Sequence, residues 1–282
     1  MPTLLFSSRT EIIENFASYN VARELINFGF EQKTEIEWVY KKAKLIDAKF
    51  DRAFNVFTGD ISVDYNTDYF VVLSPHRSEA KLKRLTTHIP GNWNNAEYGG
   101  KPRTLNVSYP SKQRAILCAL FEKNKKYKLN FEVNYEVDHH GPTISKPIPI
   151  IFVELGSSEN EWKNQLAARA IAEAVFEVIN EHNNQSSGQR SEQCSERCTY
   201  FGIGGGHYAP QFTKYSLREG FCFGHMLPKY NIDTITEATF KQAIEKNIEK
   251  IDGILLDKNG VNKEQRNKIE RLASDFGLFL CL

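Results

Sequence analysis

The chain has 282 residues, of which 41% are hydrophobic, so it is long enough to bury a full core. Its 36 Lys and Arg residues balance 35 Asp and Glu residues, which excludes a globally basic surface and leaves only local patches for a nucleic acid. We expect a cytoplasmic protein without a membrane span, because no run of about 18 apolar residues occurs and the 5 cysteines lack the spacing of a disulfide scaffold.

Strands and helices are predicted to alternate along the chain. We expect strands at 3–7, 36–40, 54–58, 69–73, 128–137, 148–155, 199–204, 253–256 and 278–281. We expect helices at 10–28, 111–121, 158–179, 234–248 and 262–276. This order predicts one α/β domain over residues 1–282 with a mixed, largely parallel central sheet. A polar segment without periodicity, at 183–193, is expected to be a mobile surface loop.

Two of these helices carry capping signals at their first residues. Ser158 with Glu161, and Thr234 with Glu237, have the spacing of a capping box, in which the hydroxyl and the carboxylate each bind a backbone N–H group. Each pair therefore predicts a helix that begins directly after the Ser or Thr.

Histidines are concentrated in short segments rich in glycine or proline that follow predicted strands. These histidines are His76, His88, His139, His140, His207 and His225. Imidazole is the commonest metal ligand in proteins and the usual acid or base near neutral pH. Because loop tips after strands would expose these rings to a substrate, the pattern predicts a hydrolytic enzyme.

Carboxylates accompany these histidines at two places. Asp138 precedes His139 and His140, and the following Gly-Pro turn could bend the chain so that both rings point the same way. Alternatively, one ring packs in the core and the other is exposed. Glu154 ends the most apolar strand, where α/β sheets bind ligands, and could be a metal ligand, a general base or a partner of loop N–H groups.

Three glycines, Gly204, Gly205 and Gly206, precede His207. No Gly-Lys-Ser/Thr follows, so the segment is not a P-loop, and we expect no helix after it because Pro210 interrupts the chain. The glycines either allow close approach of the backbone to a ligand or permit close packing against a helix.

Basic residues near the first histidines are the best predicted contact for RNA. This predicted substrate-binding set comprises His76, Arg77, Lys81, Lys83, Arg84, Lys101 and Arg103, together with the three glycines. Trp93 and Tyr98 are interspersed among the charges, which is typical of nucleic-acid surfaces. A second run, 123–128, is the next candidate, although a charge run is usually only a solvated face.

Taken together, these segments resemble one family. Ser-Pro-His-Arg-Ser at 74–78, Thr-His-Ile-Pro-Gly-Asn at 87–92, His-His-Gly-Pro-Thr at 139–143, Val-Glu-Leu-Gly-Ser-Ser at 153–158, Gly-Ile-Gly-Gly-Gly-His-Tyr-Ala-Pro at 202–210 and Phe-Gly-His at 223–225 occur in this order in the archaeal and plant type of D-aminoacyl-tRNA deacylase. The resemblance implies hydrolysis of the ester between a D-amino acid and tRNA, which keeps D-residues out of translation. It also implies a monomer without an obligate protein partner, two zinc ions per chain, and a three-layer α/β/α fold akin to phosphorylases and peptidyl-tRNA hydrolases.

Under this resemblance the predicted catalytic residues are His139, His140, Glu154 and His207. The metal ligands are expected among His88, His139, His140, Glu154, His207 and His225, and spacing does not decide between them. We expect His140 and His207 to share one site, with Glu154 within reach of both. Metal-free catalysis stays open, because an aminoacyl ester is labile and a neighbouring 2′-hydroxyl can assist.

Two other classes of function remain as alternatives. A zinc-dependent peptidase or amidohydrolase acting on small substrates would lack a basic surface beside its site. A non-catalytic tRNA-binding protein would bind uncharged tRNA without hydrolysing any aminoacyl ester.

Overall fold

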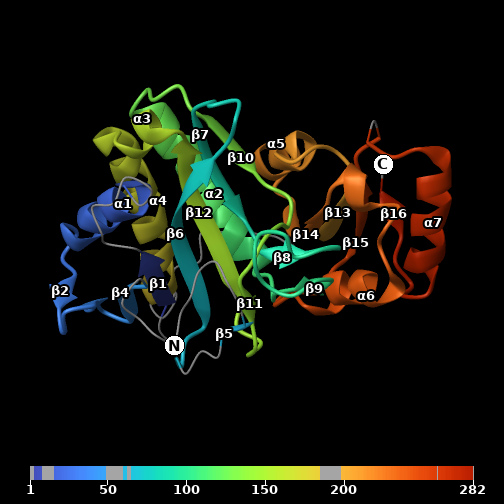
Figure 1. The fold of residues 1–282 in the computed structure, drawn as a ribbon, viewed down its shortest axis with the longest axis horizontal. Coiled ribbons are helices and arrows are strands. Elements are labelled where there is room, and N and C mark those ends of the chain that lie inside the picture. Colours follow the sequence, from blue (N-terminus) through green and yellow to red (C-terminus); the bar gives the residue numbers. More distant parts are fainter. Residues whose placement is uncertain are drawn as a thin grey trace.

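The structure, a computed structural model, combines an eight-stranded mixed sheet with a four-stranded parallel sheet (Figure 1). It describes residues 3–7, 16–48, 60–61, 65–184, 198–258 and 260–281. The larger sheet has the order β10-β7-β12-β6-β1-β4-β3-β2 and consists of β1 (Thr3–Ser7), β2 (Glu31–Gln32), β3 (Glu37–Tyr40), β4 (Ala43–Asp47), β6 (Tyr69–Arg77), β7 (Arg84–His88), β10 (Glu132–Tyr135) and β12 (Ile150–Ser157). The smaller sheet has the order β14-β13-β15-β16 and consists of β13 (Thr199–Ile203), β14 (Cys222–Leu227), β15 (Gly253–Leu256) and β16 (Leu280–Cys281). The predicted α/β class is confirmed, but the strands divide between two sheets instead of forming one.

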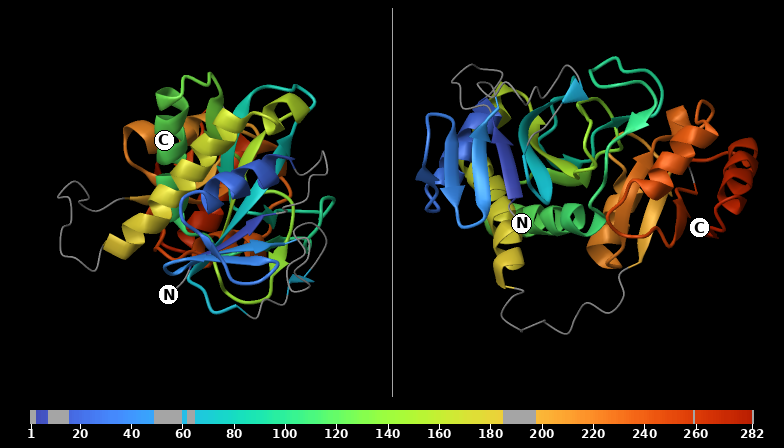
Figure 2. Two further views of the ribbon diagram at one scale, coloured as in Figure 1. Left: turned by 90° about the vertical axis from the view of Figure 1, so that its left-hand side faces the viewer. Right: turned by 90° about the horizontal axis from the view of Figure 1, so that it is seen from below.

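Helices connect and cover these sheets. They are α1 (Phe16–Ile26), α2 (Pro110–Lys126), α3 (Glu159–Trp162), α4 (Gln165–Asn184), α5 (Pro210–Arg218), α6 (Glu237–Glu245) and α7 (Lys263–Ser274). Two short strand pairs, β5 (Asp60–Ile61) with β11 (Thr143–Ile144) and β8 (Gly91–Asn92) with β9 (Thr104–Leu105), lie outside the two larger sheets. Helix α2 contacts α4, β10 and β14, and the view from below shows it, in green, running between the two sheets (Figure 2). No helix in the described ranges is long and apolar enough to cross a membrane.

Alternation along the central strands divides the larger sheet into two unlike faces. In β6, Tyr69 and Val71 join the core under α1 and α4, whereas Phe70 and Val72 join a separate core on the opposite face. Successive side chains of a strand point to opposite faces. The even-numbered residues of β6, β7, β10 and β12 therefore face away from these helices, and most of the polar groups described below come from that set.

Several predicted boundaries were wrong for local reasons. A helix, α5, does follow the glycine segment, and it begins at Pro210 because the first helical residue needs no free N–H group. Helix α6 is capped by Thr236, whose hydroxyl accepts the N–H of Thr239, and not by Thr234. The predicted strand at 128–137 is shortened to β10, since the residues before it include two with left-handed backbone.

The helix predicted at 158–179 is divided into α3 and α4. Ser158 donates its hydroxyl hydrogen to Glu161 instead of accepting a backbone N–H group, so the predicted capping box is not formed. The N–H groups of Lys163 and Asn164 bind the carbonyls of Glu159 and Glu161, which closes α3 before Asn164 caps the start of α4 through the N–H of Ala167.

Some predictions fall on residues outside the described ranges. These are the strand at 54–58, the first six residues of the helix at 10–28, and residues 185–193 of the polar loop. Asn183 and Asn184 of that loop belong to α4.

Candidate active site

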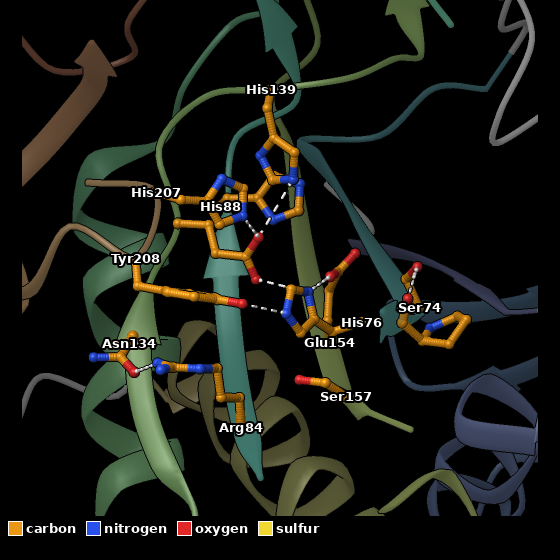
Figure 3. Close-up of polar contacts among 12 residues, drawn as sticks. Ser74, His76, Arg84, His88, Asn134, His139, Glu154, Ser157, His207 and Tyr208 are labelled. Atoms are coloured by element: carbon orange, nitrogen blue, oxygen red, sulfur yellow. Dashed lines mark hydrogen bonds and ion pairs between the residues drawn. The ribbon is translucent and has the colours of Figure 1, made fainter. Parts of the chain in front are cut away.

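A cluster of imidazole and carboxylate side chains gathers beside the larger sheet, at the ends of β7 and β10 and along β6 and β12 (Figure 3). Its members are His76 on β6, His88 on β7, Glu136 and His139 and His140 after β10, Glu154 on β12, and His207 after β13. Because parallel β6 and β12 place residues 76 and 154 on the same face, side chains far apart in sequence meet here. The structure therefore brings together six of the predicted site residues and adds Glu136.

Glu136 is the centre of this cluster and is fully buried. Its Oε2 accepts a hydrogen bond from His207 Nε2 at 2.9 Å and lies 3.3 Å from His139 Nε2. Its Oε1 lies 3.2 Å from His76 Nδ1. The backbone N–H of Glu136 binds Thr87 O at 3.1 Å, which extends the β10–β7 pairing by one residue and fixes the side chain on the polar face.

Sequence reasoning missed Glu136 although a signal was present. The residue lies inside the predicted strand at 128–137, between Tyr135 and Val137, both of which are buried in the helix-covered core. Strand alternation alone therefore places a carboxylate on the opposite face, one residue beyond the end of β10.

Three groups of side chains in the described part of the chain have donor atoms close enough to hold a metal ion. They are His88–His139–His140, Glu136–His139–His207 and His76–Glu136–Glu154, and within each group the donor atoms lie within 4.8 Å of one another. The middle group shares His139 with the first and Glu136 with the last. Two ions that share no ligand would therefore occupy the first and last groups.

Backbone carbonyls fix the orientation of the two adjacent histidines. His139 Nδ1 donates to Val137 O at 2.8 Å, and His140 Nδ1 donates to Gly141 O. In a neutral ring this leaves the lone pair on Nε2. A second hydrogen bond of this kind is typical of metal-binding histidines, since it sets the tautomer and the orientation of the ring.

Burial and charge divide the cluster into neutral and charged groups. Burial lowers the pKa of His88 well below its usual range, and it lowers the pKa of His139 to about 3. Burial would raise the pKa of Glu136, but the hydrogen bond from His207 and the charge of His76 outweigh it and hold that pKa well below normal. Burial would lower the pKa of His76, but its hydrogen bond to Glu154 and the charge of Glu136 raise it to about 10. His88 and His139 are therefore neutral, whereas Glu136 is ionised and His76 is protonated.

A tyrosine and an arginine adjoin the cluster at His76. The hydroxyl of Tyr208 lies 3.0 Å from His76 Nε2, and the guanidinium of Arg84 lies 3.7 Å from the centre of the Tyr208 ring (Figure 3). Arg84 also binds Asn134 and Glu132, each at 2.7 Å. Predicted as part of an RNA-contacting set, Arg84 is instead buried, because it is an even-numbered residue of β7 and faces the cluster.

The three glycines before His207 differ in the space around them. A Cβ atom on Gly205 would lie 2.8 Å from an Asp257 carboxylate oxygen, and Gly204 is similarly crowded by Val261, so both glycines permit close packing against the connection after β15. Only Gly206 has open space beside it. The carbonyl of His207 accepts the N–H of Val137 at 2.9 Å, which holds the imidazole beside the residues after β10.

His225 and Asp138 form a separate buried pair. His225 Nδ1 binds Asp138 at 2.6 Å and its Nε2 binds Lys246 O at 3.1 Å, so both ring nitrogens are occupied, and His225 belongs to none of the three groups above. Asp138 therefore orients His225 and not the adjacent histidine pair. Glu154 likewise binds His76 at 3.2 Å, and the carboxylate that contacts His207 is that of Glu136.

The remaining predicted basic residues are exposed. Arg77 is the last residue of β6, Lys81 and Lys83 lie on the β6–β7 loop, and Lys101 and Arg103 lie on the loop between β8 and β9.

The second predicted basic run is partly neutralised by helix α4. Lys123 pairs with Glu177 and Lys126 with Glu173. The run at 123–128 is therefore a weaker candidate for phosphate contacts than the two loops.

Comparisons with known proteins agree on one family. A family model described as D-aminoacyl-tRNA deacylase matches residues 63–280. Proteins named D-aminoacyl-tRNA deacylase from Thermococcus onnurineus and Pyrococcus horikoshii are 34% and 36% identical to the chain, covering 98% and 93% of it and 97% and 94% of their own lengths. A crystal structure described as a conserved protein of unknown function superimposes with a TM-score of 0.79 at 26% identity, covering 99% of this chain and 94% of its own.

Proposed function

The chain belongs to the D-aminoacyl-tRNA deacylase family, and we propose that it hydrolyses the ester between a D-amino acid and the terminal ribose of tRNA. The products are the free D-amino acid and tRNA. We locate the reaction at this site because a buried carboxylate, Glu136, is paired there with a partly exposed imidazole, His207, beside further imidazoles.

Glu136 and His207 have the arrangement of a general-base pair. The side chain of His207 is 34% exposed, whereas that of Glu136 is fully buried. Because His207 Nε2 donates to the carboxylate, the neutral ring carries its lone pair on Nδ1. Nδ1 can take a proton from a water molecule, and the carboxylate stabilises the imidazolium that forms.

With His207 as the base, the reaction requires no second side chain to carry a proton. The oxygen of water bonds to the ester carbonyl carbon as its proton moves to His207 Nδ1. The bond between that carbon and the ribose oxygen breaks, and the same proton returns to the ribose oxygen. His139 lies beside His207, with ring centres 4.6 Å apart, and His140 Nε2 lies 3.2 Å from His88 Nε2, so these imidazoles adjoin the proposed base.

The donor set fits zinc. The neutral His139 presents its Nε2 lone pair to the Glu136 carboxylate at 3.3 Å, and two facing lone pairs repel unless a cation neutralises them. Buried His88 Nδ1 also has no hydrogen-bond partner within the described ranges. We propose that His88, His139 and His140 hold one ion and that Glu136, Glu154 and His76 hold the second, for which His76 must give up its proton. This leaves His207 as the base. When bound, zinc supplies a Lewis acid that polarises a carbonyl and acidifies water.

Tyr208 lies to the left of His76 in Figure 3, and Arg84 lies below the tyrosine ring. The Tyr208 hydroxyl contacts His76 Nε2, and Arg84 packs against the tyrosine ring, so these two side chains restrain the orientation of His76. A monomeric state and the three-layer relation to phosphorylases and peptidyl-tRNA hydrolases remain parts of the proposal.

The test is deacylation of D-tyrosyl-tRNA and L-tyrosyl-tRNA by the intact protein and by the His207→Ala variant. We expect release of the D-amino acid by the wild type, little release of the L-amino acid, and a strong loss in the variant. Equal rates with both esters would contradict the chiral selectivity. No hydrolysis of either ester would contradict the proposed activity itself.

A further inference from the structure

Tyr98 is a large aromatic side chain exposed beside the candidate active site. It lies between β8 and β9 and is 77% exposed. Its carbonyl accepts the N–H of Gly141 at 3.1 Å, and Gly141 directly follows His140. The loop that carries this ring is therefore bonded to the segment that carries the histidines.

The backbone around Tyr98 is held firmly. Asn92 donates its side-chain amide to Gly99 O at 2.9 Å and to Lys101 O at 3.2 Å. The N–H of Lys101 donates to Thr143 Oγ1 at 2.8 Å. Gly99 and Gly100 both have positive φ, and a Cβ atom on Gly141 would lie 2.5 Å from Gly100 N, so the two loops pack without room for a side chain.

Two cations accompany the exposed ring. Lys101 and Arg103 follow Tyr98 in the same loop and are exposed, and Arg103 is fixed by a 2.9 Å bond from its N–H to Asn94 O. One acid, Glu97, opposes them. An exposed aromatic ring with neighbouring cations is the combination that binds unpaired nucleotides, because the ring stacks on a base and the cations face phosphates.

We propose that Tyr98 is the stacking platform for the unpaired base of the 3′-terminal nucleotide of tRNA, with Lys101 and Arg103 facing the preceding phosphates. This inference rests on the proposed function. The scissile ester is on the ribose of that terminal nucleotide, so its base must lie directly beside the histidine cluster. Tyr98 is one hydrogen bond away from the residue after His140, and its ring is open to solvent.

A second exposed ring near the cluster provides a competing location for the base. Tyr230, on the short 3-10 helix Lys229–Asn231, is 57% exposed. Burial of its hydroxyl, and then the charge of Glu136, raises the pKa of Tyr230. Tyr230 lacks the fixed loop with two exposed cations that surrounds Tyr98, so we assign the stacked base to Tyr98.

The experiment measures binding of an RNA hairpin that ends in single-stranded ACCA, by fluorescence anisotropy at fixed salt. We expect Tyr98→Ala to weaken binding roughly 5- to 150-fold, the range found when a stacking aromatic is removed, and Tyr98→Phe to bind like the wild type. The matched control is Phe279→Ala, which removes a ring that is 79% exposed before β16 at the far edge of the smaller sheet.

The same hairpin without its terminal nucleotide identifies the base that stacks. Its removal should weaken binding to the wild type and to Tyr98→Phe but should have little further effect on Tyr98→Ala, because the two losses remove one interaction. Additive losses, or a loss in Tyr230→Ala but not in Tyr98→Ala, would overturn the proposal.

Catalysis separates this proposal from the proposed function. If the wild type hydrolyses D-tyrosyl-tRNA and Tyr98→Ala binds the hairpin normally, the platform is wrong and the function stands. If the wild type hydrolyses no aminoacyl ester, the function fails whatever the hairpin shows. Circular dichroism should be unchanged in Tyr98→Ala, because backbone bonds and not the ring hold the loop.

Discussion

Replacing Glu136 by Gln should stop catalysis while leaving the fold intact. The amide is nearly the same size as the carboxylate but has no charge, and it can present N–H groups where His207 Nε2 now donates at 2.9 Å. The ring would then have to accept on Nε2 and carry its hydrogen on Nδ1, which is the wrong tautomer for a base that takes a proton through Nδ1. A change of this kind in a carboxylate–histidine pair lowers kcat by roughly 10⁴-fold.

The cost in stability should be much smaller than the cost in catalysis. Glu136 is fully buried and contacts three imidazoles, at 2.9, 3.2 and 3.3 Å. The amide keeps an acceptor for one of them, so we expect a loss of about 1–3 kcal/mol, the cost of leaving a buried polar group unsatisfied. His76 keeps its contact with Glu154, which limits the loss.

The assay is single-turnover deacylation of D-tyrosyl-tRNA, combined with urea unfolding of the same variants. The matched control is Glu132→Gln, the same substitution on β10 at a side chain that is mostly exposed and pairs with Arg84. A Glu136→Gln variant that is folded and retains wild-type kcat would refute the reasoning. An equal loss in Glu132→Gln would show that the effect is not specific to the cluster.

Four further results are expected. His140→Ala and His207→Ala should each slow deacylation strongly, and the double variant should be about as slow as the slower single one, because the two act as a unit; multiplying losses would place them in different sites. Tyr208→Phe should lower kcat by about 10-fold with unchanged KM, since one hydrogen bond to the His76 ring is lost, and the ¹⁵N shifts of His76 should change with it; an unchanged imidazole signal would contradict a positioning role. Removal of metal by a chelator should abolish deacylation and lower Tm, and added zinc should restore both, whereas full activity with no detectable bound metal would favour metal-free catalysis. At pH values above the ordinary carboxyl pKa, Glu173→Gln should lower the free energy of unfolding. The difference from the wild type should vanish as pH falls through about 2. Burial raises the pKa of Glu173, but its bonds to Lys126, Tyr127 and Arg169 outweigh this and lower it to about 2, so the stabilisation is lost on acidification; urea unfolding from pH 7 to pH 2 that shows a constant difference would contradict this.

The sequence by itself determined the class of fold and the family. Local apolar patterning predicted strand β15 at its observed bounds and placed α2 and α7 close to theirs. The histidine-containing segments identified the family, because their order along the chain is specific even where each segment alone is not. Propensity and periodicity depend on neighbours within a few residues, and such signals survive without knowledge of the tertiary structure.

The tertiary structure decided how the site residues are paired. The sequence suggested Asp138 beside the two adjacent histidines, but the carboxylate that contacts His139 and His207 is Glu136, while Asp138 binds His225. These partners come together only when β13 and β14 of the smaller sheet are placed against the end of β10. Spacing along the chain carries no information about that placement.

Burial was also decided by the sheet and not by local composition. The histidines predicted at exposed loop tips include His76, His88 and His225, which are buried within β6, β7 and β14. Arg84 is buried for the same reason, since its position on β7 turns it toward the cluster. A strand assigns each side chain to one face, but only the neighbouring strands and helices determine whether that face is open to solvent, buried in a core or lined by other polar groups.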